Sequence, residues 1–360
     1  MSSFLARAGL GLILLAGSVG ATPSSRLSSA LDHYQRIAAS GGWEAMPDGP
    51  LVRPGETDEV QVPALRRRLQ AEGALGQASS TGVTLDPSLA AALAAAQDRM
   101  GLANDGVIGP KTRAALDVPA RERARQIEVA LDELASLRIP ASGRWVLVNV
   151  PEFRVRAFED GRETMRQRAV VGADRDGWRT PLFEDEIEYL EFRPVWNVPA
   201  SIAIEELLPK GADALEAEGF ELVRRFSPDA EVHVMTPDNL ERLREGHLLI
   251  RQAAGPGNPL GRVKIMFPNV NNVYLHDTPA RSYFARDLRA LSHGCVRLED
   301  PAGMSAWLMG WSRERVLEAM NGGPSRRVDL PARVPVILAA LPAWADDEGD
   351  VWFAGPGYSE

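Results

Sequence analysis

The chain has 360 residues, which is enough for two or three domains and for at least one sizeable hydrophobic core. Lys and Arg number 40 against 49 Asp and Glu, so the formal charge is −9, which argues against a protein that binds nucleic acid through its phosphates. Hydrophobic residues make up 45% and charged residues 25% of the sequence, as in ordinary folded proteins, so wholesale disorder is excluded.

The N-terminal segment, residues 1–21, has the features of a secretory signal peptide. Arg7 precedes an uncharged, apolar run from Ala8 to Val19, and Val19-Gly20-Ala21 offers small residues to a signal peptidase. The run is shorter than the ~20 residues that a membrane-spanning helix needs. We therefore expect cleavage, a periplasmic protein and no stable membrane span, with a membrane anchor as the alternative.

Short amphipathic helices are predicted in the interval 58–117. Apolar residues recur at helical spacing around Leu65 and again around Leu93. The Asp105-Gly106 pair predicts a tight turn, and Pro110 is well placed to open a third helix. These features predict a small all-α module.

A charged helix over about 120–137 leads to residues 140–143, whose composition is typical of a domain junction. Apolar and polar residues then alternate along 145–172, and strand character returns at 263–267 and 273–276. We therefore expect a β-rich (α+β) domain after the junction.

The interval from about 201 to 250 interrupts these strands with charged, helix-like sequence. It is too long for an ordinary hairpin loop. We expect a helical insertion, and the sequence leaves open whether it is a lid or a solvated addition.

The only cysteine, Cys295, has no partner for an internal disulfide. A thiol is mostly protonated at neutral pH, so nucleophilic catalysis requires a neighbouring base or cation. His276, His293 and Arg297 are candidates for that neighbour, and Gly294 lets a substrate approach backbone amides that can face an oxyanion. The pattern is typical of acyl transfer by a cysteine, and a buried, inert thiol is the alternative.

The hexapeptide Ser292-His293-Gly294-Cys295-Val296-Arg297, together with the upstream His276, resembles the signature of the L,D-transpeptidases with a YkuD-type catalytic domain. The segments Trp196-Asn197-Val198-Pro199 and Phe267-Pro268-Asn269 are similar to the YcbB-like branch of that family. The resemblance extends from about Tyr34 to about Phe353.

The resemblance implies that Cys295 is the nucleophile and His276 its general base, oriented by a backbone carbonyl rather than by the neighbouring Asp277. His293 and Gly294 would shape the oxyanion pocket beside the Cys295 amide. The candidate substrate-binding residues are Arg297, Tyr274, Ser292 and Asn258.

Two of these candidates have open alternatives. Arg297 would hold a substrate carboxylate or pair with an acid such as Glu299. Tyr274 would orient the imidazole of His276 or line the acyl pocket.

The interval from Asp58 to Leu116 resembles the three-helix peptidoglycan-binding domain, most clearly from Asp105 to Leu116. Ala96-Gln97 stands where that family usually has Phe-Gln, so use as a spacer competes with glycan binding.

Two rival functions follow from the same residues. A zinc-dependent peptidoglycan peptidase or amidase would use histidine and cysteine ligands, but the sequence has neither His-Glu-x-x-His nor Cys-x-x-Cys. A catalytically silent wall-binding scaffold is the other rival. We predict neither a metal nor a cofactor.

The complete prediction is a multidomain enzyme that forms 3→3 crosslinks between peptidoglycan stem tetrapeptides through a cysteine thioester. Its partners would be donor and acceptor stem peptides, with carbapenem-type β-lactams as covalent inhibitors; the sequence does not identify the acceptor. The predicted parts are a signal peptide (1–21), a lead-in segment (22–57), a helical peptidoglycan-binding-like domain (58–117), a helical linker (118–143), a catalytic domain (144–340) and a C-terminal tail (341–360).

Overall fold

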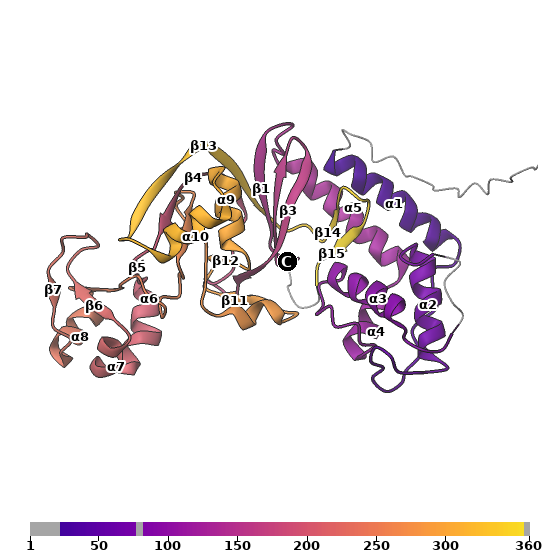
Figure 1. The fold of residues 1–360 in the computed structure, drawn as a ribbon, viewed down its shortest axis with the longest axis horizontal. Coiled ribbons are helices and arrows are strands. Elements are labelled where there is room, and N and C mark those ends of the chain that lie inside the picture. The colour runs from indigo at the N-terminus through magenta and orange to yellow at the C-terminus, as the bar shows by residue number, and fades with distance from the viewer. Residues whose placement is uncertain (1–21, 77–81, 356–360) are drawn as a thin grey trace, which may run out of the picture.

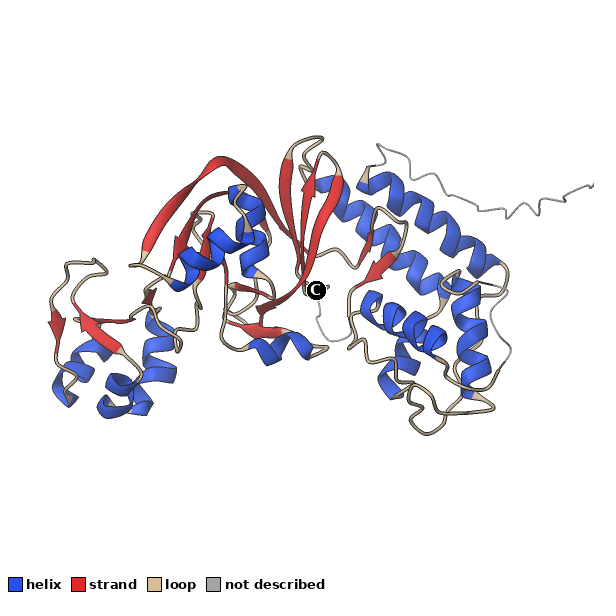
Figure 2. Cartoon of the chain, viewed as in Figure 1, coloured by secondary structure: helices blue, strands red, loops and turns tan. Residues whose placement is uncertain are grey.

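The computed structural model describes residues 22–76 and 82–355, so the predicted signal peptide lies outside it. The molecule is elongated, with a helical region at one end, a β-rich domain in the middle and the insertion at the other end (Figure 1). Figure 2 shows how helices dominate the first region and strands the second. In the described part of the chain, no helix has the length and apolarity needed to cross a membrane.

The helical module confirms the predicted all-α unit. It contains α2 (Gln61–Glu72), α3 (Pro87–Arg99) and α4 (Pro110–Leu116), whose apolar faces share one core. Asp86 caps α3 by accepting hydrogen bonds from two backbone amides of its first turn, and Pro110 opens α4 as predicted. Helices α3 and α4 therefore begin where the local sequence supplies a start signal.

Gln97 organises the turn that joins α3 to α4. Its amide nitrogen donates to Asp105 and Thr112, and its amide oxygen accepts from the Gly106 backbone at 2.8 Å. The residue is only 1% exposed. The Gln of the unusual Ala96-Gln97 pair therefore holds the turn, while Ala96 fills a core position.

Among the described residues, the first part of the predicted lead-in and much of the predicted C-terminal tail belong to a second core. Helix α1 (Pro23–Ala39) packs along α5 (Ala120–Ser136), and the hairpin of β14 (Ala343–Ala345) and β15 (Val351–Phe353) packs with them. Trp344 in that hairpin is completely buried. The sequence pattern missed this arrangement because the partners lie at opposite ends of the chain.

The β-rich domain is one sheet that closes on itself. The strands run in the order β11-β3-β12-β10-β9-β4-β13-β1-β2, and β2 also pairs with β3. Most neighbours are antiparallel, but β1–β13, β10–β12 and β11–β3 are parallel. Their bounds are β1 (Arg144–Asn149), β2 (Arg154–Glu159), β3 (Arg162–Gly172), β4 (Phe183–Phe192), β9 (Val263–Met266), β10 (Leu275–His276), β11 (Ala290–Ser292), β12 (Val296–Leu298) and β13 (Arg326–Ala339).

Strand β1 shows how this barrel is fixed in the molecule. Val146 and Val148 enter the barrel core, whereas Trp145 and Leu147 enter the core formed with α1 and α5. Successive side chains of a strand point to opposite faces, so one strand serves both cores. Helices α9 (Pro301–Met309) and α10 (Arg313–Asn321) contribute to the barrel core, and the 3₁₀ turn η3 (Arg281–Ala285) precedes β11.

The insertion is a small α/β unit: it contains helices, as predicted, and also a sheet that the sequence pattern did not indicate. Its strands form a separate sheet in the order β5-β8-β6-β7, and Leu215, Leu222 and Ile250 belong to its own core. Strands of two to four residues are too short to give an alternating pattern, so the sequence indicated only helices. Its elements are β5 (Trp196–Asn197), α6 (Ala200–Ile202), the π-helical turn η1 (Ala203–Leu207), η2 (Leu208–Lys210), α7 (Ala212–Ala217), β6 (Phe220–Val223), β7 (Val232–His233), α8 (Pro237–Arg244) and β8 (Leu249–Gln252).

Polar contacts join the helical module to the barrel near the segment that leads into β11. Asp98 of α3 pairs with Arg154 at 2.5 Å and with Arg168 at 3.2 Å. Asp287 accepts from Lys111 Nζ at 2.6 Å and from the Ala103 amide at 2.7 Å. The module therefore supports the segment that runs towards Cys295.

Candidate active site

A cleft of about 940 Å³ lies between the barrel and the insertion. The insertion contributes Glu206 and Phe226 to its lining. The predicted site residues that line it are Tyr274, His276, Ser292, His293, Cys295 and Arg297.

The pairing of β10 with β12 explains why most of these side chains share one face. Leu275 lies opposite Val296 in this parallel pair, and both side chains are buried in the barrel core. Residues that flank them in sequence point the other way, towards the cleft. Tyr274 and His276 therefore stand beside Cys295 and Arg297, although the two segments are distant in sequence.

The Cys295 thiol has hydrogen-bond partners from the neighbouring strand region. It donates to the Asn272 carbonyl oxygen at 3.7 Å, and it is also hydrogen-bonded to the Tyr274 hydroxyl. Among the described residues, the ring of His276 is not one of its hydrogen-bond partners. Burial raises the pKa of the thiol, and the contacts with Tyr274 and the charges of Lys264 and Arg297 oppose that rise.

Tyr274 places an aromatic ring beside His276 in the cleft. Its ring lies 5.7 Å from the His276 ring in an edge-on arrangement, and Lys264 Nζ lies 4.1 Å from its centroid. Burial, followed by the nearby Cys295, raises the pKa of its hydroxyl well above the usual value. The phenol therefore stays protonated and can donate a hydrogen bond to sulfur.

His276 is a neutral imidazole in this structure. Its ring is buried, and Nδ1 lies 2.5 Å from the Asp277 backbone oxygen, which assigns the ring proton to Nδ1. Burial and the charge of Arg297 lower its pKa to about 3, and hydrogen bonds to the backbones of Asp277 and Leu260 partly offset them. The Asp277 carboxylate accepts instead from the amides of Arg262 and Thr278.

The turn before the nucleophile is held by its own hydrogen bonds. Ser292 Oγ donates to the Cys295 carbonyl at 2.5 Å and accepts from the Gly294 amide at 3.2 Å. Thr180 Oγ1 donates to the Gly294 carbonyl at 2.8 Å, and Gly294 has a φ of 112°, which favours glycine. Ser292 was predicted to bind substrate, but its hydroxyl is hydrogen-bonded within the turn and Ser292 is only 1% exposed.

Arg297 and Lys264 make the barrel side of the cleft cationic. The buried Nε of Arg297 has no hydrogen-bond partner within the described residues, and the predicted alternative partner, Glu299, contacts the Arg168 amide instead. Lys264 pairs with Glu191 at 3.6 Å. An anionic group entering the cleft would therefore meet the unpartnered Nε of Arg297 and, beside it, a lysine that is paired with Glu191.

His293 faces the insertion. Its Nε2 lies 2.5 Å from Glu206 Oε1, and its ring lies 3.5 Å from the ring of Trp178. The guanidinium of Arg175 lies 3.1 Å from the Trp178 centroid. The side chain is thus held between an aromatic ring and a carboxylate.

Asn258 does not belong to the cleft lining, in contrast to its predicted role in substrate binding. The residue is 1% exposed, and its amide nitrogen donates to the Pro194 carbonyl at 3.0 Å and to the Ala253 carbonyl at 3.2 Å. Its side-chain oxygen accepts from the Leu260 amide at 2.9 Å. These bonds tie the chain together where it enters and leaves the insertion.

Sequence reasoning missed three residues of the site. Lys264 alternates with buried residues of β9, and that alternation would have placed it on the cleft face. Glu206 and Trp178 carried no such signal, because they reach His293 only through the tertiary fold.

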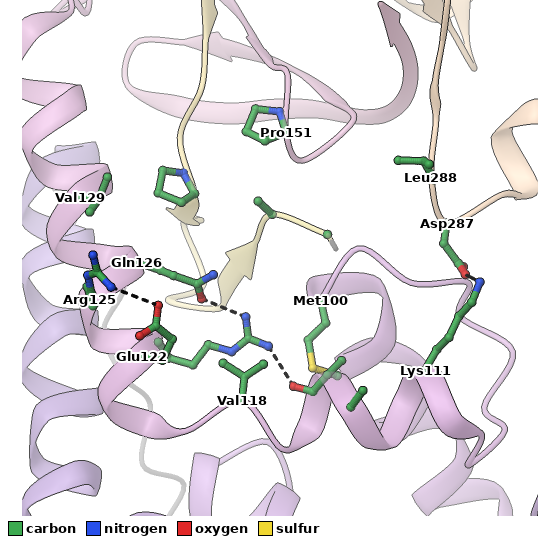
Figure 3. Close-up of a pocket in the computed structure, with 16 residues that line it drawn as sticks. Met100, Lys111, Val118, Glu122, Arg125, Gln126, Val129, Pro151, Asp287 and Leu288 are labelled. Atoms are coloured by element: carbon green, nitrogen blue, oxygen red, sulfur yellow. Dashed lines mark hydrogen bonds and ion pairs between the residues drawn. The ribbon is translucent and has the colours of Figure 1, made fainter. Parts of the chain in front are cut away.

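A second cavity, of about 860 Å³, lies between the helical module and the barrel domain. Figure 3 shows Lys111 paired with Asp287 on one side and Glu122 near Arg125 on the other. None of the predicted site residues lines this cavity, so we assign the chemistry to the cleft. Within residues 22–76 and 82–355, no three His, Cys, Asp or Glu side chains are grouped as metal ligands.

Comparison with family models gives two matches. Residues 143–330 match the model of the L,D-transpeptidase catalytic domain (YkuD), and residues 58–116 match that of the "Putative peptidoglycan binding domain". The chain is also similar to a "Putative L,D-transpeptidase" of Haemophilus influenzae, with 28% identity over 218 residues. That alignment covers 58% of this chain and 43% of the relative, so the chain spans less than half the length of the protein it matches.

Solved structures give weaker likenesses. An L,D-transpeptidase from Stackebrandtia nassauensis aligns at 16% identity and a TM-score of 0.34, covering 82% of this chain and 97% of that one. One from Xylanimonas cellulosilytica aligns at 17% identity and a TM-score of 0.27, covering 81% and 99%. L,D-transpeptidase 3 from Mycobacterium tuberculosis, in complex with a faropenem-derived adduct, aligns at 15% identity and a TM-score of 0.26, covering 54% and 60%.

Proposed function

Because the chain belongs to the family of L,D-transpeptidase catalytic domains, we propose that it crosslinks peptidoglycan stem peptides through a thioester on Cys295. The observation that carries the proposal is the thiol in the cleft, hydrogen-bonded to Tyr274 and on the same face as His276. A nucleophile, a neutral base and two cations beside one cleft are the groups that acyl transfer from an anionic peptide requires.

In the first half-reaction, a carboxylate of a donor tetrapeptide binds at Arg297. His276 accepts the thiol proton on Nε2, and the sulfur attacks the carbonyl of the third stem residue. The Cys295 amide, held by the turn at Gly294, donates to the developing oxyanion. The terminal D-Ala leaves as an amine with the proton from His276, and the acyl group remains on sulfur.

Arg297 also links donor binding to the strength of the base. Its charge is the second cause, after burial, of the low pKa of His276. A donor carboxylate that pairs with Arg297 would offset this charge and make the imidazolium easier to form. The base then becomes stronger when the substrate is in place.

In the second half-reaction, an amine of an acceptor stem attacks the thioester and forms a 3→3 crosslink. The insertion wall, including Phe226, would limit access of water to the thioester and favour aminolysis over hydrolysis.

Carbapenem-type β-lactams present a strained amide to the same thiol, and we propose that they acylate it. We further propose a periplasmic location and a wall-anchoring role for the helical module.

Intact-protein mass spectrometry tests this function. Incubation with a purified tetrapeptide stem should add an acyl mass to Cys295 and release D-Ala, and digestion of treated cell wall should yield 3→3 dimers. A Cys295→Ala variant should fold, because one small side chain is removed, and should show neither product. The absence of an acyl adduct on the parent protein, with either the stem or a carbapenem, would overturn the proposal.

A further inference from the structure

We propose that Glu206 and His293 form a dyad that receives the acceptor amine and takes its proton during aminolysis of the thioester. This inference rests on the proposed function and concerns only its second half-reaction. His293 is the catalytic base of the dyad, and Glu206, which acts through it, is a positioning residue.

The contact is specific and crosses the cleft. Glu206 lies on the π-helical turn η1 of the insertion, and its Oε1 atom is 2.5 Å from His293 Nε2. Isolated π-helical turns are rare and occur frequently at functional sites. His293 directly precedes Gly294 and Cys295, so the contact links the insertion to the nucleophile turn.

The geometry also assigns the tautomer. An Nε2–H that donates to Glu206 leaves the Nδ1 lone pair to accept a proton. The Trp178 ring packs against the imidazole, with Arg175 on Trp178 in turn, so the ring is restrained on one side. The side chain of His293 is 28% exposed, and the residue lines the cleft.

Charge explains why the amine should arrive on this side. A free amine of a stem peptide is largely an ammonium ion at neutral pH. The barrel wall around His276 presents Arg297, which repels a cation, whereas Glu206 on the insertion, whose charge also acts on Arg297, attracts one. The donor carboxylate and the acceptor ammonium would therefore bind on opposite walls.

The proton and electron balance is complete without a further reagent. The ammonium loses one proton to solvent, and the lone pair of the amine forms the new N–C bond to the thioester carbonyl. The C–S bond breaks with its electron pair on sulfur, and the remaining surplus proton of the amine moves to His293 Nδ1. The imidazolium, stabilised by Glu206, returns this proton to the thiolate or to solvent.

The test separates the two half-reactions in the full-length protein. Acylation is followed with a tetrapeptide stem, and the isolated acyl-enzyme is then mixed with D-methionine as the acceptor amine. In Glu206→Gln, acylation should stay within about twofold of the parent, while aminolysis should slow by about tenfold, because a positioned base contributes roughly 10²–10⁴ in rate and this change only weakens it. Glu205→Gln, which alters the adjacent exposed carboxylate, is the matched control and should change neither step.

A second variant keeps the inference falsifiable. His293→Gln should slow aminolysis at least as much, and the double variant with Glu206→Gln should be no slower than His293→Gln alone, because the two act as one unit. Equal slowing of acylation and aminolysis in Glu206→Gln, or no slowing of either, would overturn the dyad. A parent protein that never forms an acyl-enzyme would instead contradict the proposed function itself.

Discussion

The two walls of the cleft differ in secondary structure, in burial of their functional side chains and in charge. The barrel wall places Tyr274, His276 and Cys295 on or beside paired strands, and His276 is 3% exposed. The insertion wall is a separately folded unit with its own core, and its Glu206 side chain is 45% exposed. The residues beside the Cys295 sulfur are therefore held in place by strand pairing, whereas Glu206 on the insertion is accessible to an acceptor substrate.

The difference also has an electrostatic side. Arg297 and Lys264, which is paired with Glu191, lie on the barrel wall. Glu206 lies on the insertion wall, where Arg251 is paired with Glu221. Such an arrangement orients a donor and an acceptor of opposite charge before reaction, which lowers the entropic cost of bringing them together. Removing one group at a time from the barrel wall should reveal which property each provides.

Among the barrel-wall variants, His276→Ala is expected to have the largest effect on the acylation rate. Loss of the base should slow acylation of Cys295 by roughly 10²–10⁴-fold without preventing folding. Because the pKa of His276 is lowered to about 3, the imidazole is neutral throughout pH 5–8, so the parent acylation rate should show no inflection near pH 6.5. Stopped-flow acylation by a carbapenem across this range measures both.

The direction in which the acylation rate changes with pH follows from the pKa of the Cys295 thiol. Its pKa is raised by burial, so the acylation rate of the parent should still be rising with pH above the ordinary thiol range. An inflection near pH 6.5 that disappears in His276→Ala would show that the ring titrates there and would contradict its assignment as a neutral base.

The position of these barrel residues was predictable in outline. A contiguous motif around Cys295 and an upstream His276 were enough to expect them together, and the parallel pairing of β10 with β12 is what brings them to one face. A β-rich (α+β) domain and the helical module were likewise indicated by periodicity and by turn residues such as Pro110, whereas the closure of the sheet into a barrel was not. A single sequence carries this information because periodicity and turn residues act on the backbone within a few positions.

The rest depended on contacts between distant segments. Asn258 was a plausible ligand-binding amide by residue type, but its burial and its backbone partners are set by the tertiary fold. Glu206 meets His293 across 87 positions, and α1 meets the C-terminal hairpin across most of the chain. No periodicity in a single sequence encodes such pairings.

An intermediate effect is expected from Arg297→Met. A hydrogen bond to a charged group contributes about 1.5–3 kcal/mol, so loss of the donor carboxylate contact should raise KM for the tetrapeptide by roughly 10- to 100-fold. The same change removes a charge that lowers the pKa of His276, so that pKa should rise, which NMR titration of the ring can follow. A raised KM without any rise in the His276 pKa would separate binding from base activation.

The smallest effect should come from Lys264→Met. Lys264 is one of the charges that oppose the burial-induced rise in the pKa of Cys295, and the pKa of the thiol should therefore rise further when this charge is removed. An interaction of about 1 kcal/mol corresponds to roughly a fivefold lower thiolate fraction, so iodoacetamide should alkylate the variant about fivefold more slowly at neutral pH. Lys264→Arg keeps the charge over the Tyr274 ring and should restore most of the rate. If the Lys264→Met variant is alkylated as fast as the parent, then the charge of Lys264 acts on the substrate and not on the Cys295 thiol.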